Sequence, residues 1–117
     1  VGEILDIIHQ VDLNDFQLKI IGDGPSRNDL ENKLNSNENL KDKVQFLGSQ
    51  SISEIYKELT KSKIFLFTSK TECLPTVLIE ANLMSNALIS YNCNYGPSDI
   101  VNESNGFLIP KSDRSNL

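Results

Sequence analysis

The residues that could do chemistry gather in the stretch TECLPTVLIE (residues 71–80), which carries two glutamates. Glu72 precedes a proline that starts an apolar run, and Glu80 stands inside that run between Ile79 and Ala81. A carboxylate among apolar neighbours needs hydrogen-bond donors, because burying an unpaired charge is costly. Since a carboxylate can only accept hydrogen bonds, the vicinal hydroxyls of a sugar are suitable partners.

A helix is predicted to follow, with Pro75 at its first position, where its fixed φ suits the turn. The free N–H groups of Thr76 and Val77, together with the helix dipole, then predict an anion site. Glu80 is expected in a narrow polar gap of a helix that is apolar almost all round. The alternative is that neither glutamate binds a ligand. Glu72 is then an ordinary solvated loop acid, and Glu80 is a helix carboxylate that pairs with a nearby lysine or backbone amide. Two acids beside a cleft also fit hydrolysis, but a helix start that favours anions suits binding better.

The elements that must position these residues are predicted from apolar runs. The runs are near-continuous, as in parallel strands that are buried on both faces. Between them, SISEIYKEL has helical spacing and a capping box of Ser51 and Glu54. This alternation predicts an α/β fold, a Rossmann-like three-layer sandwich with a parallel sheet of about five strands. The five runs are LKII (18–21), VQFL (44–47), IFLF (64–67), ALIS (87–90) and FLI (107–109).

Ligands of such sheets bind beyond the carboxyl ends of the strands. After the first strand, GDGPS (22–26) either admits a ligand closely or is a tight turn that packs the next helix on the strand, and both interpretations stay open. A dinucleotide fingerprint is incomplete, because Arg27 replaces the third glycine and Gly48-Ser49 replace the expected acid. The chain also lacks the Gly-Lys-Ser/Thr end of a P-loop.

Composition and charge argue against several other classes of protein. The chain has 117 residues, enough for one domain, and its net charge of −5 with scattered Lys and Arg argues against a nucleic-acid surface. No apolar run approaches the roughly 20 residues that span a bilayer. Cys73 and Cys93, with His9 as the only other soft ligand, indicate neither a zinc site nor a disulfide framework, so reduced cytosolic thiols are expected. Because Val1 falls in a helical pattern and Leu117 ends a polar segment, we expect an excerpt of a longer protein.

ECLPTVLIEA, preceded by IFLFTSKT, resembles the Glu-x7-Glu signature of retaining glycosyltransferases with two Rossmann domains, specifically glycosyltransferase family 4. The blocks LKIIGDGPSRNDLENKL, KVQFLGSQSISEIYKEL and NCNYGPSDIVNESNGFLIP resemble successive parts of that family's C-terminal, donor-binding domain. The resemblance implies that residues 1–117 form this nucleotide-sugar-binding domain, incomplete at both ends. YGPSDIV resembles members that build bacterial capsular, exopolysaccharide or lipid-linked glycans, which favours a UDP-hexose over a GDP-sugar donor.

The resemblance also implies roles for individual residues. Glu80 resembles the glutamate that binds the donor ribose, and Glu72 resembles the catalytic-site glutamate that holds the hexose near its reacting carbon. Cys73 replaces the usual glycine and adds a thiol beside the sugar pocket. The other implied donor-binding residues are Leu74, Thr76 and Val77 at the sugar and diphosphate, Ser49 and Gln50 at the base, and Gly22 and Gly24 on the cleft floor.

The implied activity is transfer of a hexose, with retention of configuration, from a nucleotide-sugar to a glycan or lipid-linked acceptor. In this family the leaving diphosphate is stabilised by the helix start with an Arg and a Lys that precede the region, so neither metal nor cofactor is expected. The acceptor, and any contact with the inner face of the membrane, belong to an N-terminal domain. We therefore expect the cytoplasmic fragment alone to bind donor without turnover.

Other functions remain open on the same fold. One is a non-catalytic nucleotide-sugar-binding or accessory module, and another is a UDP-sugar epimerase or hydrolase. A receiver or flavodoxin-like domain fits less well, because neither an acidic cluster nor a phosphate loop follows the first strand.

Overall fold

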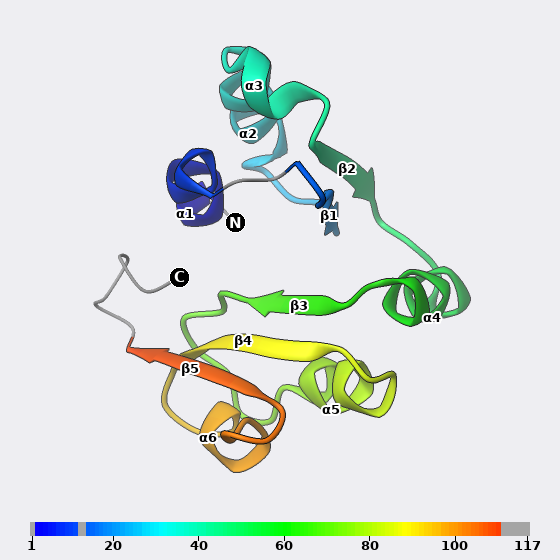
Figure 1. Cartoon of the computed structure of the whole chain (residues 1–117), viewed down its shortest axis with the longest axis vertical. Coiled ribbons are helices and arrows are strands. Elements are labelled where there is room, and N and C mark those ends of the chain that lie inside the picture. Colours follow the sequence, from blue (N-terminus) through cyan, green and yellow to red (C-terminus); the bar gives the residue numbers. More distant parts are fainter. Residues whose placement is uncertain (1, 12–13, 111–117) are drawn as a thin grey trace. The chain divides into compact units, whose positions relative to one another are not determined.

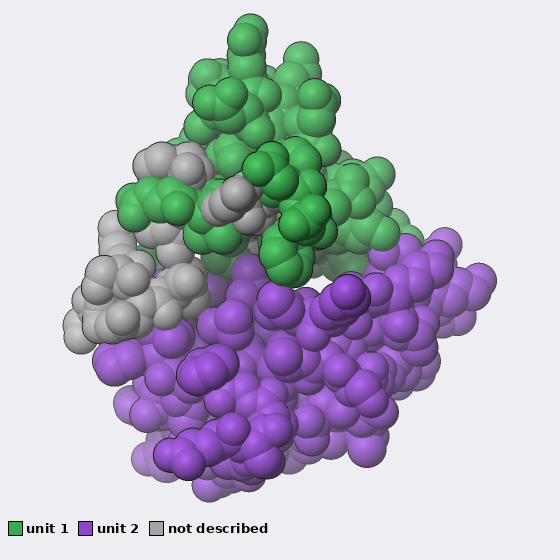
Figure 2. Space-filling model, in the orientation of Figure 1, with its two compact units in different colours: residues 1–52 green, residues 53–117 purple. Residues whose placement is uncertain are grey.

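The computed structural model describes residues 2–11 and 14–110 (Figure 1). The predicted truncated ends at Val1 and Leu117 lie outside the described residues. The chain divides into two compact units, residues 1–52 and 53–117 (Figure 2). Each unit is an α/β assembly with parallel strands, and the prediction of one nucleotide-sugar-binding domain over the whole chain stays a prediction.

The first unit contains two parallel strands that pair with each other. Its helices cover these strands with apolar side chains. Leu34, Leu40 and Val44 are buried, and α3 contacts both α2 and β2. Helix α3 starts within the polar segment 35–39, and its Leu40 packs inward. The elements are α1 (Gly2–Ile7), η1 (Ile8–Gln10), β1 (Leu18–Ile21), α2 (Arg27–Asn35), α3 (Glu38–Lys41) and β2 (Val44–Gly48).

The second unit is a three-stranded parallel sheet in the order β3-β4-β5, with α5 and α6 packed on β4 (Figure 1). Helix α4 begins at Ile52, directly after Ser51, as the predicted capping box requires. No helix of the described residues is long and apolar enough to cross a membrane. The elements are α4 (Ile52–Lys61), β3 (Ile64–Phe67), α5 (Thr76–Leu83), β4 (Ala87–Asn92), α6 (Pro97–Ile100) and β5 (Gly106–Pro110).

The predicted α/β, Rossmann-like class is confirmed, and all five predicted strands are present and parallel. The backbone pairs β1 with β2 in the first unit, and β3 with β4 and β4 with β5 in the second. Burial on both faces holds best for the central strand β4, where Leu88 and Tyr91 lie on opposite faces and are both buried. Ile64 in β3 and Phe107 in β5, the outer strands of this three-stranded sheet, are exposed. The three-layer arrangement stays a prediction.

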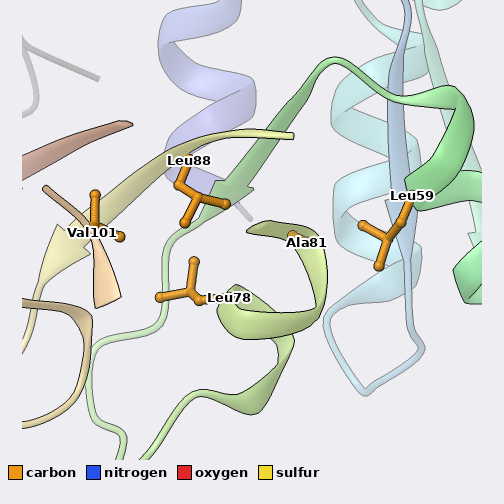
Figure 3. Close-up of a cluster of buried hydrophobic side chains, with 5 residues drawn as sticks. All are labelled: Leu59, Leu78, Ala81, Leu88 and Val101. Atoms are coloured by element: carbon orange, nitrogen blue, oxygen red, sulfur yellow. The ribbon is translucent and has the colours of Figure 1, made fainter. Parts of the chain in front are cut away.

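A small apolar core holds the second unit together (Figure 3). Leu78 and Ala81 project from one side of α5 onto Leu88 of β4 and are fully buried. They lie three residues apart, which is the spacing of one helix face. Leu59 of α4 and Val101 after α6 complete the cluster. The position of α5 relative to the sheet is therefore fixed by apolar packing.

Asn86 links this core to the helix ends. Its side-chain amide is buried and donates to the carbonyls of Leu59 at 2.9 Å and Ala81 at 3.2 Å. Its Oδ1 atom is buried without a hydrogen-bond partner among the described residues. The amide of Asn86 thus joins the end of α4 to the end of α5 just before β4 begins.

We expect Asn86→Ala to lower the free energy of unfolding by about 1–3 kcal/mol, because two buried carbonyls lose a donor. Urea denaturation measures the change. Asn82→Ala is the matched control: Asn82 is exposed on α5, and its replacement should change stability by less than about 0.5 kcal/mol. Equal stability of the two variants would contradict the linking role of Asn86.

Candidate functional site

The connection from β3 to α5 carries the predicted chemistry and ends in a tight turn. Pro75 has φ −78° and ψ 83°, and the N–H of Thr76 donates to the Leu74 carbonyl at 2.9 Å. These values describe an inverse γ-turn at Pro75. The predicted placement of Pro75 at the first helical position is wrong by one residue, because this turn makes Pro75 the N-cap and Thr76 the first helical residue.

The γ-turn changes the predicted anion site. Thr76 was expected to offer a free N–H, but that group is occupied by Leu74. The next amide differs, since the Val77 N–H is not a donor in the backbone hydrogen bonds of the described residues around this turn. Leu78 in turn donates to the Pro75 carbonyl at 3.0 Å. Of the two predicted donors, only the Val77 N–H therefore remains free among the described residues.

Glu80 lies in α5, one turn after Thr76. It was predicted in a narrow polar gap of the helix, and the structure shows the residue partly buried and partly exposed to solvent. The Tyr56 hydroxyl approaches Glu80 Oε1 at 3.5 Å, which is long for a hydrogen bond of this type. Among the described residues, no Lys or Arg pairs with Glu80, in contrast to the alternative of an ordinary ion-paired helix acid. Its carboxylate keeps unused acceptor capacity.

Glu72 lies before the γ-turn and is partly buried. Beside it, Cys73 is an exposed free thiol and Leu74 is 58% exposed, so neither belongs to the core. Cys93 is also a free thiol, and it is buried. The predicted sugar-binding segment is therefore open to solvent on the side that carries Glu72 and Cys73.

The loop after β4 closes against this segment at Gly96. Gly96 is buried and has φ 97°, a conformation that side chains rarely allow. A Cβ atom there would come within 2.4 Å of Pro75 Cδ and 3.2 Å of the Cys73 carbonyl oxygen. Only glycine permits this approach, so Gly96 fixes the turn between the two glutamates.

In the first unit, the loops after β1 and β2 meet. Gly22 donates its N–H to the Gly48 carbonyl at 2.8 Å. The pairing register shifts between Ile20 and Ile21, so β2 carries one extra residue at this end. Gly22 and Gly48 have φ of 122° and 69°, which explains why both are glycines.

Gly24 begins a turn rather than a dinucleotide-type loop. Its carbonyl accepts the Arg27 N–H at 3.0 Å, and Ser26 has φ −83° and ψ 0°, as the third residue of a type I turn requires. Asp23 Oδ1 accepts the Gly24 N–H at 2.8 Å. The interpretation of GDGPS as a tight turn leading into α2 is confirmed, and this interpretation does not exclude a ligand.

The predicted base-contacting residues follow directly. Ser49 is exposed, and Gln50 folds back so that its Nε2 donates to the Leu47 carbonyl at 2.6 Å. The first unit thus brings Gly22 and Gly24 together with Ser49 and Gln50 at the carboxyl ends of β1 and β2.

Sequence reasoning missed Arg27. Its Nε donates to Glu31 Oε1 at 2.7 Å, and its Nη1 lies 3.5 Å from Asp23 Oδ2. The hydrogen bond to Glu31, with the charges of Glu31 and Asp23, raises the pKa of Arg27 above its ordinary value. The spacing of four residues on each side of Arg27 could have indicated these contacts.

The described part of the chain contains no group of three or more His, Cys, Asp or Glu side chains that could hold a metal ion. The expectation that no metal is needed stays a prediction. The second unit places Glu72, Cys73, Leu74, Thr76, Val77 and Glu80 around one turn, while the first holds the four remaining predicted residues.

Residues 2–117 match the family described as glycosyl transferases group 1. The chain belongs to this family. It is similar to the amylovoran biosynthesis glycosyltransferase AmsD of Erwinia amylovora, with 32% identity over 92% of this chain and 30% of that protein. It is also similar to the Escherichia coli UDP-Gal:alpha-D-GlcNAc-diphosphoundecaprenol alpha-1,3-galactosyltransferase, with 33% identity over 80% of this chain and 24% of that protein.

A solved structure has the same fold. It is the pneumococcal O-GlcNAc transferase GtfA in complex with UDP and GlcNAc, with a TM-score of 0.76 and 25% identity over 97% of this chain and 22% of that chain. This group 1 chain therefore spans less than a third of the length of each of these proteins.

We expect Gly96→Ala to destabilise the protein by at least about 2 kcal/mol, because the new Cβ crowds Pro75 and the positive φ is strained. Thermal unfolding measures the loss. Gly24→Ala is the control, since a Cβ there has no neighbour within 4 Å. If both variants melt at the same temperature as the unchanged protein, Gly96 does not fix the turn.

Proposed function

We propose that this chain is the donor-binding part of a retaining glycosyltransferase of family 4, which transfers a hexose from a nucleotide-sugar to a glycan or lipid-linked acceptor. The observation that carries the proposal is the placement of Glu72 and Glu80 on either side of the turn at Pro75, with Glu80 free of a basic partner among the described residues. Such an acid suits a ligand that brings several hydroxyl donors.

Each group around the turn has a proposed task. Glu80 accepts hydrogen bonds from the two ribose hydroxyls. The Val77 N–H, at the start of α5, faces the diphosphate, where the helix dipole favours negative charge. Glu72 holds the hexose through its hydroxyls, so that the anomeric carbon faces the acceptor.

Catalysis then consists of placing the donor and stabilising the departing diphosphate. We propose that no metal takes part. The acceptor hydroxyl, and the Arg and Lys that assist the leaving group in the family, come from outside this chain. We also propose a cytoplasmic protein whose contact with a membrane is made elsewhere than in this chain.

A UDP-linked donor is supported by two of the similar proteins. The Escherichia coli relative is named for UDP-Gal, and GtfA is solved in complex with UDP. In the first unit, the base is proposed to lie over Ser49 and Gln50. The exposed backbone at Ser49 offers hydrogen bonds there, while Gly22 and Gly24 allow the ligand to approach the chain closely.

Two variants test the assignment by calorimetry with the intact natural polypeptide, using UDP, GDP, UDP-glucose and UDP-galactose. Glu80→Gln should weaken the binding of the bare nucleotide and of the nucleotide-sugar alike, by about 1.5–3 kcal/mol. The reason is that charged hydrogen bonds to the ribose are lost. Glu72→Gln should weaken only the nucleotide-sugar, since its partner is the hexose.

Glu103→Gln is a suitable control, because Glu103 is exposed in the turn before β5, and it should change neither affinity. Binding of UDP that is unchanged by Glu80→Gln would refute the ribose contact. If the intact polypeptide binds no nucleotide at all, the donor-binding function itself is wrong.

A further inference from the structure

The guanidinium of Arg27 covers the backbone of Gly48. A Cβ atom built on Gly48 would lie 2.8 Å from Arg27 Nη1, so the arginine occupies the space that a side chain at this position would take. Gly48 is buried, whereas Ser49, the next residue, is exposed. Arg27 therefore lies directly beneath the start of the turn that leads to Ser49 and Gln50.

Two carboxylates hold the guanidinium in place. Glu31 binds Nε from the next turn of α2, and Asp23 approaches Nη1 from the loop after β1. Asp23 also accepts the Gly24 N–H, which ties its own carboxylate to the backbone. The arginine side chain is only 30% exposed. A fork with donors in two directions can satisfy both acids at once, which the single ammonium of a lysine does less well.

The turn beneath which Arg27 lies begins at a glycine, whose backbone has more conformational freedom than that of other residues. Gly48 has a positive φ, follows an irregularity in the β1–β2 pairing, and as a glycine is free to adopt many backbone conformations. One backbone hydrogen bond from Gly22 and the Gln50 side chain's bond to Leu47 hold the turn from the other sides. Arg27 adds a further contact, because it fills the space beside Gly48 that a side chain would take.

We propose that Arg27 is a positioning residue for the nucleotide: held by Asp23 and Glu31, it fixes the turn at Gly48 and so presents Ser49 and Gln50 to the base. The inference rests on the proposed function, because it assumes that the base binds at this turn. Arg27 acts through the turn and does not itself touch the donor. Pre-ordering of a binding loop raises affinity, since less conformational freedom is lost when the ligand binds.

The test compares ligands with and without the base, using the intact natural polypeptide. Calorimetry is run with whichever of UDP and GDP binds more tightly. It is also run with ribose 5-diphosphate, which lacks the base. Arg27→Met should weaken the nucleotide about tenfold, the cost of ordering roughly one backbone residue, and leave ribose 5-diphosphate unchanged. The nucleotide affinity of Arg27→Lys should lie between that of Arg27→Met and that of the unchanged protein.

The control is Lys33→Met on the same helix. Lys33 forms an exposed ion pair with Asp6, and its loss should not alter nucleotide affinity. Should Arg27→Met fail to fold, the same two ligands are compared with Arg27→Lys, with a smaller loss expected.

Equal nucleotide affinity in the Arg27 variants and the unchanged protein would overturn the proposal. A parallel loss for both ligands would also overturn it, because it would reveal a general structural role. Absence of nucleotide binding by the unchanged protein would instead refute the proposed function, and the inference with it.

Discussion

The close contact between Gly96 and Pro75 is the constraint on which the candidate site of the second unit depends. Strands β3 and β4 are parallel neighbours, so the loops that follow them leave the sheet at the same edge. They can pack together only because Gly96 lacks a Cβ and adopts φ 97°. The Pro75 ring, held from this side, sets the γ-turn that starts α5, and the buried Leu78 and Ala81 set the rotation of that helix. Glu80 is oriented by both.

The first unit uses the same principle with different chemistry. Gly48 again lacks a Cβ beside a strand end, but the space is filled by the guanidinium of Arg27 instead of a proline ring. The apolar contact at Gly96 is rigid because its partners are a ring and a backbone carbonyl. The contact at Gly48 is held by charge, through Asp23 and Glu31. In each unit a restrained glycine therefore holds a loop at the carboxyl ends of the strands: Gly48 ends β2, and Gly96 lies in the loop after β4.

Much of this could be predicted from the sequence, because apolar runs identify strands and Pro-initiated runs identify helices. The positions of the strands along the chain, the helix that carries Glu80 and the loops that carry the candidate residues all followed from such local patterns. The cover of Gly48 by Arg27 could not, since it depends on a contact between segments far apart in the chain. Local geometry was also ambiguous at Pro75, which suits both the N-cap and the first helical position. The partial exposure of Glu80 depends on which neighbours surround α5, and the sequence pattern does not reveal them.

The most direct test of the central claim is a crystal structure of the intact natural polypeptide with bound UDP. The account predicts both ribose hydroxyls within about 2.5–3.0 Å of the Glu80 carboxylate oxygens. It also predicts the diphosphate at the Val77 N–H, at the start of α5. A complex in which the ribose lies away from Glu80, with the nucleotide at another part of the fold, would contradict it.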